Sequence, residues 1–166
     1  MVTLKKFQEL FTPYIAFKSI STDSAYKPHI EDTIEWLCQL FDENGFNFQY
    51  LQGPNTNPIV FAHYHFDDNA ETVLVYGHYD VQPAEKKDGW TDDPFKLSIR
   101  DGRMYGRGVV DNKGQNLIHI MTVIDLIKQN KLKYNVKFMI EGNEETANED
   151  MPQIVRDNKE LLKADI

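Results

Sequence analysis

The sequence predicts an α/β fold in which helices cover both faces of a mixed β-sheet. Helical and strand-like patterns follow one another as helices, then strands, then strand, helix, strand and helix, an order typical of such sandwiches. The chain has 166 residues, of which 41% are apolar and 27% charged. That length and composition favour one domain with a sizeable core and argue against disorder.

Two amphipathic helices are expected at the start of the chain. Residues 3–18 place apolar side chains at helical spacing behind Thr3, which is a typical N-cap residue. Pro13 is expected to kink or split this helix, because proline lacks the backbone N–H that a helix interior uses. The second helix is expected over residues 29–44, with Gly45 as its C-terminal stop.

Strand patterns occupy the middle of the chain. Residues 46–51 and 59–66 favour strands, and a segment rich in Gly, Pro and Asn separates them. The apolar stretch at residues 73–76 predicts a short buried strand that ends at Gly77. This strand delivers His78 to the end of the sheet.

A hairpin, a loop and a helix are expected next. Residues 95–99 resemble a strand followed by a turn, and residues 105–114 form a glycine-rich loop. The helix expected over residues 115–129 is apolar around most of its circumference, so we expect deep burial, with His119 in the core.

The last part of the chain predicts a strand, an acidic loop and a helix. The strand covers residues 134–140, the loop residues 141–149, and Asp150 is expected to cap the helix. Residues 164–166 resemble the entry to another strand, so we expect the chain to be the front part of a longer domain.

Charge and composition exclude several classes of function. The net charge of −8 and the pI near 5.1 disfavour a nucleic-acid partner or an anionic membrane. No apolar run approaches the roughly 20 residues of a membrane span. The N-terminal segment carries Glu9 and does not resemble a signal peptide, and the single cysteine, Cys38, excludes an internal disulfide framework. We therefore expect a cytoplasmic protein.

The first candidate site residues are His78 and Asp80. Side chains two residues apart in extended backbone point the same way, so this imidazole and this carboxylate can touch. A carboxylate that accepts one ring N–H of a histidine aims the other ring nitrogen at a metal.

Two further loops carry carboxylates. Asp111 lies in the glycine-rich loop, and Glu144 with Glu145 directly follows the strand at residues 134–140. Loops at the carboxyl ends of strands build the sites of α/β sheets, and one histidine with three carboxylates suits a divalent metal. Asp111 can bridge two metals about 3.5–4 Å apart, while adjacent glutamates can divide metal binding and proton transfer.

Other residues leave alternatives open. His63 and His65 also share a strand face, but we expect them to be sheet residues and not ligands. Arg107 and Lys113 either stabilise the glycine-rich loop or contact substrate. The glutamate pair can also be read as part of a solvated acidic loop.

Four stretches together resemble the M20 family of metallopeptidases, and within it the carnosinase-like dipeptidase branch. They are Gly-His-Tyr-Asp-Val-Gln-Pro, Asp-Gly-Trp-Thr-Asp-Asp-Pro-Phe, Met-Tyr-Gly-Arg-Gly-Val-Val-Asp-Asn-Lys-Gly and Glu-Gly-Asn-Glu-Glu. The resemblance runs from about residue 14 to the last residue. It implies a zinc-peptidase-like (phosphorylase/hydrolase-like) catalytic domain that is incomplete at its C-terminus.

The resemblance also implies a role for each candidate residue. His78 resembles a ligand of one metal, Glu145 a ligand of the second, and Asp111 the carboxylate that bridges them. Asp80 resembles the residue that orients His78, and Glu144 the general base that deprotonates the attacking water. The implied cofactors are two divalent ions, zinc or else manganese or cobalt, and the implied reaction is hydrolysis of a dipeptide.

Two departures from the family pattern affect substrate detail more than chemistry. Asn112 stands where this branch often has Asp, and residues 146–148 replace small Ser and Gly residues. The family also implies a cis peptide bond between Asp111 and Asn112.

The family pattern extends past the last residue of this chain. Family members add one acidic ligand, a distal histidine, and a lid domain through which they often dimerise. We therefore expect residues 1–166 to be the N-terminal portion of a single catalytic domain that binds metal weakly and does not turn over a peptide or N-acyl amino acid alone. An N-acyl-amino-acid deacylase, a carboxypeptidase of the same family, and a non-catalytic binding or assembly module remain alternatives.

Overall fold

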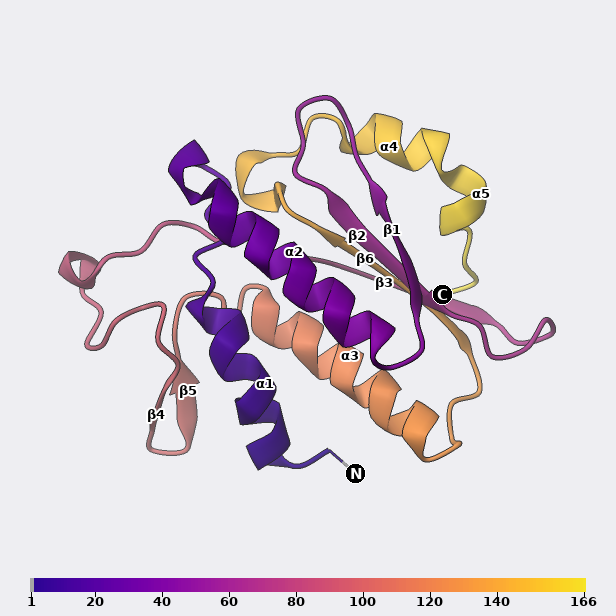
Figure 1. Ribbon diagram of the computed structural model, residues 1–166, viewed down its shortest axis with the longest axis horizontal. Helices are drawn as coiled ribbons and strands as arrows, with labels where there is room; N and C mark the ends of the chain where they lie inside the picture. The colour runs from indigo at the N-terminus through magenta and orange to yellow at the C-terminus, as the bar shows by residue number, and fades with distance from the viewer. Residues whose placement is uncertain (1) are drawn as a thin grey trace.

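The computed structural model describes residues 2–166 and confirms an α/β sandwich built on a mixed sheet (Figure 1). The strand order is β1-β2-β6-β3, and β1, β2 and β6 are antiparallel neighbours while β3 runs parallel to β6. The strands of this sheet are β1 (Asn47–Leu51), β2 (Ile59–Tyr64), β3 (Thr72–His78) and β6 (Asn135–Glu141).

Helices pack on both faces of the sheet. One face carries α1 (Leu4–Ala16), α2 (Lys27–Asp42) and α3 (Lys113–Lys128), and the other carries α4 (Met151–Asp157) and α5 (Lys159–Leu162). Within residues 2–166, no helix has the length and apolar character needed to cross a bilayer. The short 3₁₀ helices are η1 (Ser24–Tyr26), η2 (Lys86–Asp88) and η3 (Glu144–Thr146).

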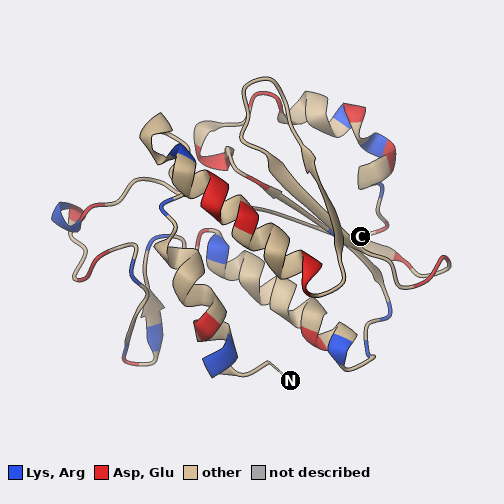
Figure 2. Ribbon diagram, in the orientation of Figure 1, with Lys and Arg blue, Asp and Glu red and all other residues tan. Residues whose placement is uncertain are grey.

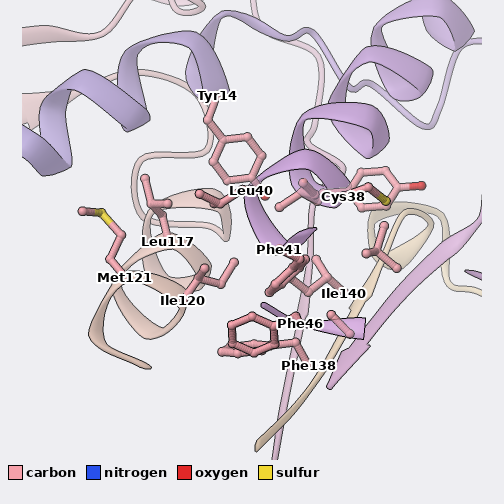
Figure 3. Close-up of a cluster of buried hydrophobic side chains, with 14 of the residues drawn as sticks. Tyr14, Cys38, Leu40, Phe41, Phe46, Leu117, Ile120, Met121, Phe138 and Ile140 are labelled. Carbon is pink, nitrogen blue, oxygen red and sulfur yellow. The ribbon is translucent and has the colours of Figure 1, made fainter. Parts of the chain in front are cut away.

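Neighbouring strand residues point to alternate faces of the sheet. Both faces are buried because helices cover them. Ala62 and Phe138, which are register partners, face α1 to α3, in the larger cluster shown in Figure 3. Phe61 and Met139, the next pair in register, face α4 and α5. Burial of each large side chain contributes about 1.5–3 kcal/mol, so both helical layers are held mainly by apolar contact.

The N-terminal helices confirm the expected caps and correct the expected break. Thr3 accepts a hydrogen bond from the backbone N–H of Lys6 at 3.3 Å, and Gly45 follows α2 with a φ of +80°. Of the two expectations for Pro13, a split of α1 is wrong, because α1 continues through it to Ala16, and a kink stays a prediction. Pro13 lies in the last turn, where the lost N–H removes only one helical hydrogen bond.

Lys113 holds the end of α1 against the start of α3. Its Nζ donates to the carbonyl oxygens of Tyr14 at 3.0 Å and Phe17 at 2.7 Å, and the side chain is fully buried. Burial lowers the pKa of Lys113 to about 7, although the charge of Asp80 acts in the opposite direction. Of the two alternatives for this lysine, its burial favours a structural role over contact with substrate.

Several expected boundaries differ from the structure. His119 is exposed and is not a core residue, since α3 packs on one side only and Ile118 beside it is 54% exposed. The glycine-rich loop starts later than expected, because β5 (Arg103–Tyr105) pairs with β4 (Ser98–Arg100) in a hairpin.

The last helix is also different from the expectation. It breaks at Asn158 into α4 and α5, and Asp150 makes no side-chain cap. The Asp150 carboxylate instead accepts the backbone N–H of Asn55 at 2.8 Å. A contact with a residue 95 positions away thus replaced the local one.

Residues at the end of the chain extend the sheet beside β3. The N–H groups of Asp165 and Ile166 donate to the carbonyl of Thr72 at 2.9 and 3.2 Å, and Leu74 donates to the carbonyl of Ile166 at 2.9 Å. This is the pattern of a parallel ladder and agrees with the strand entry expected at residues 164–166.

Charged residues are spread over the helices and loops (Figure 2). Acidic bands follow the outer side of α2, where Glu31, Asp32 and Glu35 are exposed (Figure 2). Lys and Arg are scattered over α1, α3, the β4–β5 hairpin and α4 (Figure 2).

Candidate metal centre

The candidate site forms where β3 and β6 end and α3 begins. The register of these parallel strands pairs His78 with Glu141, so the loops that follow both strands leave the sheet at the same edge. His78 is 5% exposed. The fold therefore brings together three segments that are far apart in the sequence, as expected for an α/β sheet.

Two carboxylates flank the imidazole of His78. Its Nδ1 lies 3.2 Å from Oδ1 of Asp80 and 3.0 Å from the backbone oxygen of Asp80, while its Nε2 lies 2.9 Å from Oδ1 of Asp111. Because both contacts of Nδ1 are to acceptors, Nδ1 carries a proton and donates it. Nε2 faces the carboxylate of Asp111 in the same way, so it is the ring nitrogen that a metal can take once its own proton has left.

The same contacts control the pKa of His78. Burial alone lowers the pKa, but the hydrogen bonds and charges of Asp80 and Asp111 outweigh burial and raise it to about 9. Without metal, the imidazole of His78 therefore carries both ring protons at neutral pH, and a metal must displace one of them.

Asp80 connects His78 to the glutamate loop. This carboxylate is fully buried and accepts the hydroxyl of Ser21 at 2.6 Å. It also accepts the backbone N–H groups of Glu144 at 3.3 Å and Glu145 at 3.1 Å. One carboxylate thus fixes both the histidine ring and the start of η3.

The side chains of Glu144 and Glu145 point to the same place as the His78 ring. One ligand atom from each of these three residues lies within 4.8 Å of the others. Nε2 of Gln82 donates to Oε2 of Glu145 at 2.8 Å, whereas the Glu144 carboxylate accepts no hydrogen bond within residues 2–166. An imidazole and carboxylate oxygens at this spacing fit a divalent metal such as zinc.

The start of α3 supplies Asp111. The peptide bond between Asp111 and Asn112 is cis, as the family resemblance implied. The Asp111 side chain is 72% exposed, with the 2.9 Å contact to His78 described above. The structure therefore places all five predicted site residues at one edge of the sheet. Asp111 contacts His78 directly, whereas Glu144 and Glu145 come within 4.8 Å of it in a group that does not include Asp111.

Sequence reasoning missed the residues that support the site. Ser21, Gln82 and Asn116 contact Asp80, Glu145 and the His78 carbonyl, respectively. Gln82 belongs to the stretch that contains His78, so its position was a usable signal, whereas nothing near Ser21 in the sequence indicates the contact.

The two histidines set aside from the sequence lie elsewhere. His63 is on β2, as expected, but His65 is not a sheet residue because β2 ends at Tyr64. Nε2 of His65 lies 3.2 Å from Oδ1 of Asp68. Arg107 lies over the ring of Trp90 at 5.6 Å and donates to the carbonyl of Pro83 at 3.4 Å, so its contacts favour loop stabilisation.

Comparisons with known proteins point to one family. The profile of Peptidase family M20/M25/M40 matches residues 74–165. The chain is 43% identical over 106 residues to the Beta-Ala-His dipeptidase of Rattus norvegicus, and this alignment covers 63% of this chain and 22% of the relative. It is 32% identical over 165 residues to the Cys-Gly metallodipeptidase dug1 of Schizosaccharomyces pombe, which covers 91% of this chain and 34% of the relative.

The fold is also similar to a solved structure of a dipeptidase. Human carnosine dipeptidase 1 superposes with a TM-score of 0.87 at 30% identity, over 94% of this chain and 36% of that chain. The chain thus spans between 22% and 36% of the length of these three relatives.

Proposed function

This chain belongs to peptidase family M20/M25/M40, and on that premise we propose that it carries one part of a two-metal dipeptidase site. The observation that supports this most is the convergence of His78, Glu144 and Glu145 within 4.8 Å. The Asp111 carboxylate contacts the same imidazole at 2.9 Å. The substrate class follows the relatives, whose names describe dipeptidases.

His78, Asp111 and Glu145 are the residues that we propose as metal ligands. His78 would serve one ion through Nε2, Glu145 the second ion, and Asp111 both ions. When bound, divalent cations would polarise the scissile carbonyl and lower the pKa of a water molecule. The Gln82 contact orients Glu145 for this role.

Glu144 is the residue that we propose as general base. Its backbone N–H is held by Asp80 at 3.3 Å, while its carboxylate is exposed and accepts no hydrogen bond within residues 2–166. The carboxylate is therefore free to take a proton from the attacking water and pass it to the leaving amine. Asp80 cannot do this, because its oxygens are fully buried and already accept hydrogen bonds.

We further propose that residues 1–166 form the N-terminal portion of one catalytic domain and that the ligand set within them is incomplete. Three ligand residues shared by two ions leave each ion with two protein ligands, fewer than the three of typical catalytic zinc sites. The chain alone would then bind zinc weakly and would not hydrolyse peptides.

A graft into a relative tests the proposed roles. Residues 2–166 would replace the segment of human carnosine dipeptidase 1 on which they superpose, and the product would be assayed on dipeptides and N-acyl amino acids with zinc, manganese or cobalt. We expect dipeptide hydrolysis by the graft and none by the chain alone. In the graft, Glu144→Gln should abolish hydrolysis while the metal content stays unchanged.

Three outcomes would count against the proposal. A folded graft that holds two metal ions but is inactive contradicts the catalytic roles. Hydrolysis that survives Glu144→Gln contradicts the base assignment. Faster hydrolysis of N-acyl amino acids than of dipeptides would replace the dipeptidase with a deacylase of the same family.

A further inference from the structure

We propose that Asn112 and Asn116 are positioning residues that hold the peptide backbone of His78 at the metal centre. We call this pair the asparagine clasp. Oδ1 of Asn112 accepts the backbone N–H of His78 at 3.1 Å, and Nδ2 of Asn116 donates to the backbone carbonyl of His78 at 2.7 Å. The inference rests on the proposed function, because it concerns what positions a proposed ligand.

The clasp occupies the side of β3 that faces away from β6. The backbone N–H of Tyr79 donates to the carbonyl of Glu141 at 2.8 Å, so the backbone N–H of Tyr79 points toward β6. Along a strand, the backbone groups of successive residues point to opposite sides, and those of His78 therefore point outward. A buried N–H and C=O need partners, and at His78 both partners are side chains at the start of α3, one from its N-cap residue and one from its first turn.

Gly77 allows the clasp to approach this closely. A Cβ atom at Gly77 would lie 2.0 Å from Oδ1 of Asn116 and 2.6 Å from Oδ1 of Asn112. Both distances are far below van der Waals contact, so any larger residue at this position would displace the two amides. Asn116 is only 3% exposed, which leaves it little room to move elsewhere.

The clasp connects the two segments that carry Asp111 and His78, the start of α3 and the end of β3. Asn112 is the N-cap residue of α3 and Asn116 lies in its first turn, and both side chains reach the backbone of His78. Asp111 directly precedes Asn112, and its Oδ1 lies 2.9 Å from Nε2 of His78. The clasp therefore sets the distance between one carboxylate ligand and the histidine, while Asp80 sets the orientation of the ring.

Nuclear magnetic resonance of the metal-free chain tests the clasp directly. The variants are Asn116→Ala, Asn112→Ala and Gly77→Ala, and Asn112→Asp is a conservative variant that keeps the acceptor oxygen. Asn44→Ala is the matched control, because Nδ2 of Asn44 donates to the carbonyl of Leu40 at 2.8 Å, far from the site in the sequence. The readouts are hydrogen exchange of the His78 amide and the ring Nδ1–H resonance of His78.

We expect Asn112→Ala and Gly77→Ala to accelerate exchange of the His78 amide at least about tenfold, since that amide loses its partner. Asn112→Asp should restore protection, and Asn44→Ala should leave it unchanged. Asn116→Ala and Gly77→Ala should shift or broaden the Nδ1–H resonance. A zinc titration of the same variants should show binding weakened by about 10-fold or more, the size typical of residues that support metal ligands.

The results separate this inference from the proposed function. If His78 amide exchange and the ring resonance stay as in the wild type in folded Asn112→Ala and Gly77→Ala, the clasp is overturned, whatever zinc does. If these signals change as expected but the wild type binds no zinc, the clasp stands and the metal centre is wrong. If Asn116→Ala does not fold, Asn112→Ala with its rescue by Asn112→Asp still decides the question.

Discussion

Two aspartates contact the same imidazole from opposite sides, and their surroundings differ completely. Asp80 is fully buried and holds Ser21 and the backbone of Glu144 and Glu145 as well as His78. Asp111 is 72% exposed and contacts His78 through a single oxygen. The same residue type thus serves two purposes at one histidine.

The difference supports the proposed roles of the two carboxylates, with Asp111 as a metal ligand and Asp80 as the residue that orients His78. A buried carboxylate whose oxygens already accept several hydrogen bonds is a fixed structural anchor, and its loss leaves buried donors without partners. An exposed carboxylate with one contact can change partners when an ion arrives. We therefore expect variants of Asp80 to change stability and variants of Asp111 to change metal binding.

The largest effect is expected from Asp80→Ala. Removal of this carboxylate leaves the Ser21 hydroxyl and two backbone N–H groups unpaired, and we expect a loss of about 3–5 kcal/mol in the free energy of unfolding. Urea denaturation without metal measures it. Asp111→Ala is the matched control and should change stability by less than about 0.5 kcal/mol; equal losses in the two variants would contradict the comparison.

The second effect concerns metal binding by Asp111→Ala. We expect zinc affinity to fall by at least about 10-fold, equivalent to about 1.4 kcal/mol, because a proposed ligand is lost. Calorimetric titration at neutral pH measures it, with Asp68→Ala as the control, since Asp68 also lies beside a histidine at 3.2 Å. Unchanged affinity in Asp111→Ala would show that this carboxylate is not a ligand.

A third and smaller effect is expected from Ser21→Ala. The hydroxyl donates to Asp80 at 2.6 Å, and loss of a hydrogen bond to a charged group costs about 1.5 kcal/mol of stability. Urea denaturation compares this variant with Ser24→Ala, an exposed serine three residues further along. If both variants are as stable as the wild type, the Ser21 contact does not support Asp80.

The smallest expected effect is a difference between the pKa values of two histidines. A pH titration of the metal-free chain, monitored by nuclear magnetic resonance of the histidine rings, measures it. His78 should titrate near pH 9, because the two carboxylates outweigh burial. His63 should titrate below its ordinary value near 6.5, because burial and the charges of Lys137 and His65 lower its pKa. A histidine with a depressed folded-state pKa destabilises the fold as the pH falls through about 6.5.

Asp111→Ala sharpens this titration. The pKa of His78 should fall when that carboxylate is removed, and the pKa of His63 should stay the same. A His78 ring that titrates near pH 6.5 in the wild type would show that neither aspartate contacts it as described.

Much of the fold was predictable because local pattern and tertiary packing agree in it. A short apolar stretch placed β3, and the two-residue spacing of His78 and Asp80 predicted their contact. Failures occurred where a distant partner decided the outcome. The Asp150 carboxylate binds the backbone of Asn55 instead of capping its own helix, and that partner cannot be read from neighbouring residues.

The candidate site shows the same division. Its five residues lie in recognisable stretches, so their types and order indicated a metal centre. The clasp was not predicted, because Asn116 resembles any polar residue in a helix until α3 is seen to begin beside Gly77. Ser21 is 59 residues from Asp80, and only the fold brings them together.

We propose that His78 is the histidine around which a divalent metal binds. The most direct test is a calorimetric zinc titration of the 166-residue chain, of His78→Ala, and of His65→Ala as a control histidine that also pairs with an aspartate. We predict weak zinc binding that His78→Ala removes and His65→Ala preserves. Zinc binding that survives His78→Ala would contradict the metal centre, and tight binding of two ions by the wild type would contradict the proposal that its ligand set is incomplete.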